Sequence, residues 1–230
     1  MKNTITFLFF ILVISLQAQK IPLKEQKIVD YLRMHEQEQI DFLEKTVNIN
    51  SCTLNLSGVK EVGMLYKNGL DALGFKTNWI TMPDSLGRAG HLFAEINEGK
   101  GKTILLIGHI DTVFEEDHEF QSFTRTGNIG KGPAANDMKG GNAVIIYALK
   151  ALHASGALKD KNIIVAFTGD EEKPGQPLSI SRHDLVEAGK KADIALGFET
   201  ASGMNHATVA RRGSSGWNIQ VKGKQAHSSG

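Results

Sequence analysis

Apolar and polar positions follow two different spacings along the chain, and these predict helices and strands in turn. In several segments apolar residues recur at steps of three and four, as on the buried face of an amphipathic helix. Between them lie short runs of branched apolar residues, such as residues 104–107 and 163–167, which are typical of buried strands. The alternation predicts an α/β fold. Helices are expected over residues 21–50, 57–73, 138–155 and 178–188, and strands over residues 75–82, 91–96, 103–107, 163–168, 193–198, 205–211 and 217–222.

Two connecting segments and one helix start add detail to this prediction. Residues 97–102 are polar and rich in glycine, which predicts a hairpin between the strands on either side. Residues 114–133 are mostly polar and lack periodicity, as in long functional loops. Ser57 is expected to cap the helix that follows it, and Gly74 suits its end.

Acidic residues and a histidine follow one predicted strand after another, each time at the carboxyl end, and one more acidic residue precedes a helix. In open α/β sheets the carboxyl ends of parallel strands meet at one edge, where ligands bind. The pattern therefore predicts a metal site assembled from strand ends. Its candidate residues are His109, Asp111, Asp137, Glu171, Glu172 and Glu199.

Taken singly, each of these residues has an ordinary structural explanation. A histidine after a strand is usually a hydrogen-bonded turn residue, and Asp137 could be no more than a helix cap. Glu171 and Glu172 could form a solvated acidic loop. A hydrolytic two-metal centre, by contrast, needs His and carboxylate ligands, a bridging carboxylate and a free carboxylate as general base. The coincidence of so many suitable positions favours the metal centre.

Composition and charge narrow the class of protein. The chain has 230 residues and a formal net charge of +1, so nothing suggests binding to nucleic acid or to an anionic membrane surface. Cys52 is the only cysteine, which excludes an internal disulfide and an all-cysteine metal site. Only His and carboxylate side chains are left as candidate ligands.

The first residues have the pattern of a secretory signal peptide. Lys2 provides the positive start, residues 5–16 are almost entirely apolar, and Ala18 closes an acceptable cleavage site. The apolar run is shorter than the roughly 20 residues of a comfortable transmembrane helix. We therefore expect a signal peptide over residues 1–18 and an exported protein, periplasmic or secreted, with no membrane attachment after cleavage; an uncleaved anchor is the alternative.

Five blocks resemble a known family: Gly108-His109-Ile110-Asp111-Thr112-Val113, Gly132 through Asp137-Met138-Lys139-Gly140-Gly141, Thr168-Gly169-Asp170-Glu171-Glu172, Glu199, and Arg211-Arg212-Gly213 through Gly223-Lys224-Gln225-Ala226-His227-Ser228. Their order and spacing resemble the co-catalytic zinc exopeptidases, which include glutamate carboxypeptidases, aminoacylase, acetylornithine deacetylase and succinyl-diaminopimelate desuccinylase. The nearest branch is that of glutamate carboxypeptidase, or carboxypeptidase G. The resemblance implies a three-layer α/β catalytic domain with a mixed, largely parallel sheet, followed by the start of an inserted α+β lid or dimerisation domain.

The resemblance also implies which residues bind metal. His109 and Glu199 would hold one zinc, Asp137 would bridge two zincs, and Glu172 would bind the second. A complete site would contain two zinc ions, with Co²⁺ or Mn²⁺ as alternative metals.

Three further residues take catalytic or positioning roles by the same resemblance. Glu171 would be the general base that takes a proton from the bridging water and passes it to the leaving amine. Asp111 would orient the ring of His109, as metal-bound histidines usually require. His227 would reach the active site of the partner subunit from the lid and contact the carbonyl oxygen of the substrate.

Two departures from the family pattern accompany these expectations. The family usually has glycine where Ala134 stands. Its last zinc-binding histidine lies near the C-terminus of a chain roughly twice as long as this one. We therefore expect the N-terminal part of such an enzyme, weakly active or inactive by itself, with a catalytic domain over residues 19–212 and the start of the lid over residues 213–230.

The implied activity is hydrolysis of an amide bond next to a free carboxylate, in small peptides or N-acyl amino acids, by a homodimer that pairs through the lid. A deacylase with the same centre is an alternative, although export favours a peptidase because biosynthetic deacylases work in the cytoplasm. A non-catalytic metal- or peptide-binding relative is a second alternative, which the presence of Glu171 disfavours. A truncated chain that folds poorly is the third.

Overall fold

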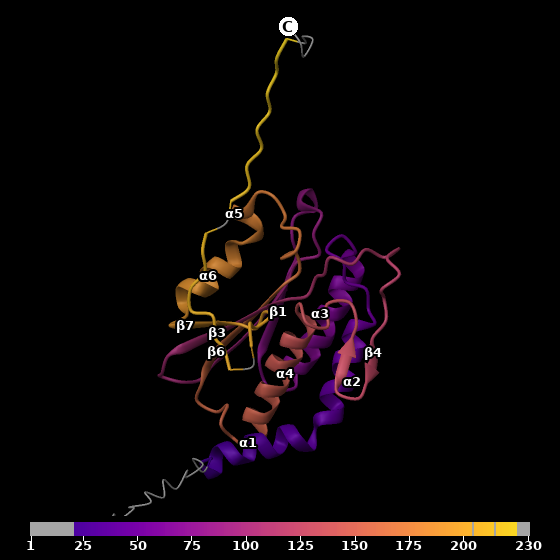
Figure 1. The fold of residues 1–230 in the computed structure, drawn as a ribbon. Coiled ribbons are helices and arrows are strands. Elements are labelled where there is room, and N and C mark those ends of the chain that lie inside the picture. Colours follow the sequence, from indigo (N-terminus) through magenta and orange to yellow (C-terminus); the bar gives the residue numbers. More distant parts are fainter. Residues whose placement is uncertain (1–20, 204, 214, 225–230) are drawn as a thin grey trace, which may run out of the picture. The chain divides into compact units, whose positions relative to one another are not determined.

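The computed structural model describes residues 21–203, 205–213 and 215–224 and confirms the α/β fold (Figure 1). The chain divides into two units, Met1–Thr200 and Ala201–Gly230, and every helix and strand that the structure describes lies in the first. The signal peptide predicted over residues 1–18 and the candidate residue His227 lie outside the described residues. The helices are α1 (Leu23–Met34), α2 (Glu36–Val47), α3 (Leu56–Asp71), η1 (Asp84–Leu86), α4 (Lys139–Ala154), α5 (Leu178–Ser181) and α6 (His183–Lys191).

A five-stranded mixed sheet forms the centre of the first unit, with the strand order β1-β2-β6-β3-β7. The pairs β1–β2 and β2–β6 are antiparallel, whereas β6–β3 and β3–β7 are parallel. The predicted mixed sheet is confirmed, but its pairs are evenly divided and not largely parallel. The strands are β1 (Lys76–Ile80), β2 (His91–Asn97), β3 (Thr103–His109), β6 (Asn162–Thr168) and β7 (Ile194–Gly197).

The hairpin predicted over residues 97–102 is wrong, because β6 lies between the two strands that this loop joins. All seven residues of β6 are buried, which suits a central position with a strand on each side and helices on both faces. The side chain of Asn162 fixes the loop: its Oδ1 accepts from the N–H of Gly99 at 2.9 Å, and its Nδ2 donates to the carbonyl of Gly101 at 3.0 Å.

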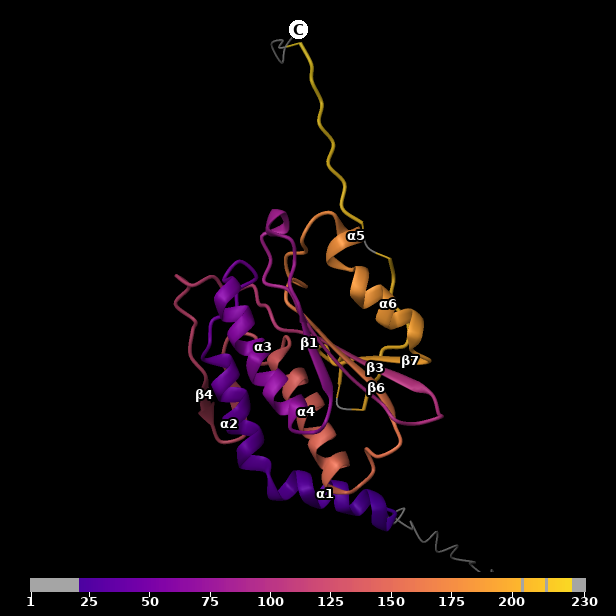
Figure 2. The same cartoon turned by 180° about the vertical axis from the view of Figure 1, so that it is seen from behind.

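Helices cover both faces of the sheet, which confirms the expected three layers (Figures 1 and 2). Helices α3 and α4 pack over one face, against Val165 and Phe167 of β6, and α1 and α2 lie against α4. Helix α6 covers the other face, where Ala188 packs against Leu105 and Ala166. A cavity of about 360 Å³ lies between α6 and the strands β1 and β2, and none of the candidate site residues lines it.

Several predicted elements differ from the structure at their boundaries. The helical pattern over residues 21–50 is two helices, because the chain leaves helical geometry at His35. Helix α3 is capped by Asn55, whose Oδ1 accepts from the N–H of Gly58 at 3.0 Å, and Ser57 instead donates to that same oxygen. Gly74, with φ +84°, follows α3 as expected.

Two further predictions need correction. The loop over residues 114–133 contains a small hairpin of β4 (Thr124–Thr126) and β5 (Ile129–Lys131). The strands predicted over residues 205–211 and 217–222 are wrong, since residues 205–213 and 215–224 contain no strand. A β-branched run becomes a strand only where a neighbouring strand supplies hydrogen bonds, and none does so in this described part of the chain.

Candidate metal centre

The candidate residues meet at the carboxyl ends of the parallel strands. His109 is the last residue of β3 and lies beside Thr168, the last residue of β6. One ligand atom each from His109, Asp137 and Glu172 lie within 4.8 Å of one another. Glu199 joins them from the segment after β7, with its Oε1 3.7 Å from His109 Nε2. Four residues predicted as metal ligands from the sequence are therefore neighbours in the structure.

The ring of His109 is oriented for binding a metal. The side chain is buried, and its Nδ1 lies 2.9 Å from the main-chain oxygen of Asp111. A carbonyl only accepts, so Nδ1 carries the proton and donates to it. Nε2 faces the carboxylate of Asp137, whose Oδ1 is 3.1 Å away; because a carboxylate only accepts, a protonated Nε2 donates to it, and a metal ion binds here in place of that proton. This is the arrangement in which one imidazole nitrogen is fixed so that the other can bind a metal.

Asp111 performs a task that the sequence did not reveal. It orients His109 mainly through its main-chain oxygen, since its carboxylate Oδ1 is 3.5 Å from Nδ1. The buried carboxylate instead accepts the N–H of Glu171 at 2.9 Å, the N–H of Glu172 at 3.1 Å and the hydroxyl of Thr53 at 2.7 Å. Asp111 thus connects the end of β3 to the turn that carries both glutamates.

The negative charges of the clustered carboxylates favour the binding of a cation. Burial acts to lower the pKa of His109, but the negative charges of Asp111, Glu199 and Glu171 outweigh it and raise that pKa to about 9. Burial raises the pKa of Glu172, and the nearby carboxylates of Asp137 and Glu171 raise it further. The pKa of Glu199 is raised by burial and by the same carboxylates. Crowded carboxylates of this kind are stabilised by a divalent ion.

The start of α4 closely follows the candidate ligand Asp137 and is anchored to a neighbouring part of the chain. Asp137 does not cap this helix, which begins after Met138 without a side-chain cap, so the simple capping explanation is wrong. The ammonium group of Lys139 is buried and donates to the main-chain oxygens of Thr46 at 2.8 Å and Ile49 at 2.9 Å. Burial of this ammonium lowers the pKa of Lys139 to about 7. Lys139, two residues after Asp137, is thereby anchored to the chain at the end of α2.

Another link joins the segments of two candidate ligands. The side-chain amide of Asn136, the residue before Asp137, donates to the hydroxyl of Thr200, the residue after Glu199, at 3.0 Å. Neither Asn136 nor Thr200 carries a signal in the sequence apart from its position beside a candidate ligand.

Ala134, which stands where the family pattern has glycine, lies at a backbone position that suits glycine. It has φ +55°, in the left-handed region that favours glycine, and it is buried. We expect Ala134→Val to lower the free energy of unfolding by more than about 2 kcal/mol, because a β-branched residue is strained at this φ. Ala134→Gly should stay within about 1 kcal/mol of the wild type, since relief of strain offsets the added freedom of the unfolded chain. Urea denaturation of both variants tests this; equal effects would contradict it.

The donor set fits a zinc ion. Zinc prefers imidazole nitrogen and carboxylate oxygen, which His109, Asp137, Glu172 and Glu199 provide. The ring of His109 is already held through Nδ1, so that Nε2 faces the other candidate ligands and can bind a metal in exchange for its proton. Glu171 lies in the same turn as Glu172, where its carboxylate raises the pKa of His109, and it is not needed to complete the ligand set.

Known proteins resemble this chain over most of its described length. Residues 105–212 match the peptidase family M20/M25/M40. Carboxypeptidase G2 of a Pseudomonas species is 34% identical over 193 residues, which are 82% of this chain and 45% of that protein. A probable succinyl-diaminopimelate desuccinylase of Staphylococcus epidermidis is 34% identical over 207 residues, which are 85% of this chain and 47% of that protein. This chain belongs to the M20/M25/M40 peptidase family.

Solved structures with low sequence identity share the fold of this chain. Human carnosine dipeptidase 1 superposes with a TM-score of 0.64 at 22% identity, over 75% of this M20 chain and 40% of that protein. An M20 family metallo-carboxypeptidase from Sulfolobus solfataricus has a TM-score of 0.56 at 22% identity, over 70% of this chain and 37% of that one. The predicted family and three-layer fold are confirmed. The chain spans about half the length of the curated relatives it matches.

The structure tests where the predicted site residues lie, but it does not test the role of each one. It brings together His109, Asp111, Asp137, Glu172 and Glu199, whereas their individual roles stay predictions. The domain boundary at residue 212 also stays a prediction. Among the residues that the structure describes, no helix combines the length and the apolar character needed to cross a membrane.

Proposed function

We propose that the protein to which this M20 chain belongs is a zinc-dependent hydrolase of amide bonds in small peptides or N-acyl amino acids. The observation that carries the proposal is the cluster of His109, Asp137 and Glu172 at the strand ends, with Glu171 in the same turn. The relatives support it, because the names carboxypeptidase and desuccinylase both denote hydrolytic removal of a group.

The residues divide the work between binding and proton transfer. Zinc held by His109, Asp137, Glu172 and Glu199 would polarise the scissile carbonyl and lower the pKa of a bound water. Glu171 takes a proton from the attacking water and returns it to the leaving nitrogen, which needs a carboxylate that is not itself a ligand. Asp111 holds the main chain of both glutamates, so the base and the ligand keep a fixed separation.

The substrate class separates two versions of the proposal. A carboxypeptidase cleaves a peptide bond to a C-terminal amino acid, whereas a desuccinylase removes an acyl group, and relatives with both names are equally identical to this chain. We favour the peptidase, because the apolar N-terminal segment supports export to the periplasm or outside the cell. Zinc as the native metal and a homodimer as the working form belong to the same proposal.

A hydrolysis assay tests the proposed function. The whole protein is incubated with zinc and with a panel of C-terminal glutamyl dipeptides and N-acyl amino acids, and the released amine is measured. We expect hydrolysis that a chelator abolishes and that zinc restores. Hydrolysis that persists after the metal has been removed, or none on any amide substrate in the panel, would contradict the proposal.

A further inference from the structure

The turn after β6, residues 169–175, carries both glutamates of the candidate centre and has no regular secondary structure. Its front is held by Asp111, as described above. Its back is held by a second set of side chains that the proposed reaction does not use. This back clamp consists of His91, Asp170, Ser181 and Arg182.

Asp170 is the centre of the back clamp. Its side chain is fully buried and pairs through Oδ1 with the guanidinium of Arg182, while Oδ2 accepts the N–H of Gly175 at 2.8 Å. Arg182 also donates through Nη2 to the main-chain oxygen of Asp170 at 3.0 Å. A buried carboxylate is costly without its counter-ion, so this pair fixes the residue directly before Glu171.

His91 and Ser181 complete the back clamp. His91 is buried at the start of β2, and its Nδ1 accepts the N–H of Gly169 at 3.1 Å. Its Nε2 therefore carries the proton and donates to the main-chain oxygen of Ser181 at 2.9 Å. The hydroxyl of Ser181 donates to the carbonyl of Gly175 at 2.8 Å. Both ends of the turn are thus tied to the sheet and to the junction of α5 and α6.

We propose that Arg182 is a positioning residue for the reaction, which through Asp170 sets the direction in which Glu171 and Glu172 enter the metal centre. The inference rests on the proposed function, since it concerns a metal that Glu172 would bind. The guanidinium is a rigid planar fork that serves the carboxylate and the carbonyl of Asp170 at once. A lysine ammonium keeps the charge but has no second nitrogen to span both acceptors, so the turn should loosen.

Amide hydrogen exchange and Co²⁺ binding test the inference in the whole protein. We expect Arg182→Lys and Arg182→Met to exchange the amides of Glu171 and Glu172 at least about tenfold faster than the wild type, as for the loss of one hydrogen bond to a charged group. Both should bind Co²⁺ about 10–100-fold more weakly, with altered visible absorption of the ion. Glu172→Gln supplies the reference for a lost ligand.

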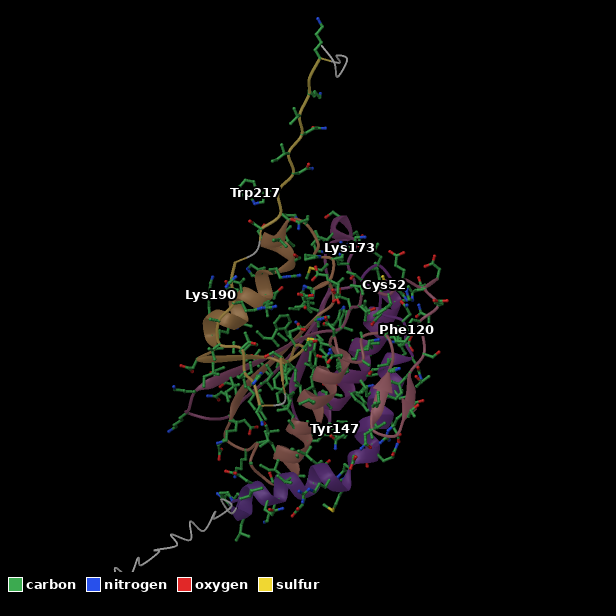
Figure 3. All side chains as sticks on the ribbon, in the orientation of Figure 1. Cys52, Phe120, Tyr147, Lys173, Lys190 and Trp217 are labelled. Carbon is green, nitrogen blue, oxygen red and sulfur yellow. The ribbon has the colours of Figure 1, made fainter. Side chains whose placement is uncertain are left out.

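The control is Lys190→Met, which removes an exposed cation of α6, labelled in Figure 3, whose Nζ pairs with Glu187 at 2.7 Å. It should match the wild type in both measurements. If Arg182→Met does not fold, Arg182→Lys carries the test, because it keeps the counter-ion of Asp170.

Two results overturn the inference while the proposed function stands. If Glu172→Gln weakens Co²⁺ binding but both Arg182 variants bind as the wild type does, the metal centre stands and the positioning role is wrong. If the Arg182 variants show faster amide exchange across the whole of β3 and β6 but unchanged Co²⁺ affinity, the ion pair of Asp170 and Arg182 has a purely structural role. If the wild type binds no Co²⁺, the proposed function fails, and the role of Arg182 fails with it.

Discussion

Glutamine in place of Glu171 should lower kcat by about 10²–10⁴-fold, the usual contribution of a general base, while the zinc content stays that of the wild type. Glutamine has the length of glutamate, but its amide cannot accept a proton from water. The main-chain N–H of residue 171 still donates to Asp111, so the turn is retained. Steady-state kinetics of the whole protein, beside elemental analysis of the same samples, measures both quantities.

Glu116→Gln is the matched control, because Glu116 is an exposed glutamate of the loop between β3 and β4. Its kcat should equal that of the wild type. If Glu171→Gln keeps full activity, Glu171 is not the base. If the variant loses zinc together with activity, Glu171 is a ligand, and the division of roles between Glu171 and Glu172 must be revised.

Asp137→Ala should abolish the stabilisation that zinc gives. A zinc concentration about 100-fold above Kd stabilises a protein by about 2.7 kcal/mol. In a domain of this size that raises Tm by about 5–10 °C. Asp137 lies 3.1 Å from His109 Nε2, and its side chain is 58% exposed, so the substitution removes a ligand without opening the core. Differential scanning calorimetry with and without zinc measures the shift, which should fall close to zero in the variant.

The metal-free variant provides an internal check. The carboxylate of Asp137 raises the pKa of Glu172 and of Glu199 by repulsion, although burial is the larger cause for both. Its removal relieves this repulsion but also removes the contact of Asp137 with His109 Nε2, so the change of Tm without zinc should be smaller than the zinc shift of the wild type. Asp117→Ala, at an exposed loop aspartate, should keep the full zinc shift. An equal zinc shift in Asp137→Ala and in the wild type would remove Asp137 from the ligand set.

Much of the candidate centre could be predicted from the sequence, because its residues sit at strand ends. Once residues 104–107 and 163–167 are assigned as buried parallel strands, His109 and Glu172 must approach each other at one edge of the sheet. The same argument places Glu199 after β7. Asp137 follows from the helix that packs against β3. Local patterns were sufficient here since the parallel sheet brings its carboxyl ends together.

Features that depend on pairing between distant segments could not be predicted. The glycine-rich loop over residues 97–102 has the composition of a hairpin, but β6, from much later in the chain, pairs with β2 on one side and β3 on the other. The carboxylate of Asp111 binds N–H groups 60 and 61 residues further along the chain. Arg182 likewise contacts Asp170 because the α5–α6 junction lies beside the turn after β6. No single-sequence spacing encodes such contacts.

Elemental analysis of the purified chain, after equilibration with zinc and removal of the unbound ion, tests the metal centre most directly. We expect at least one zinc per chain, since His109, Asp137 and Glu199 are already neighbours, and a second where Glu172 is completed by further ligands. The bound zinc should be lost when His109 is replaced by alanine. A folded wild-type chain that holds no zinc would contradict the account.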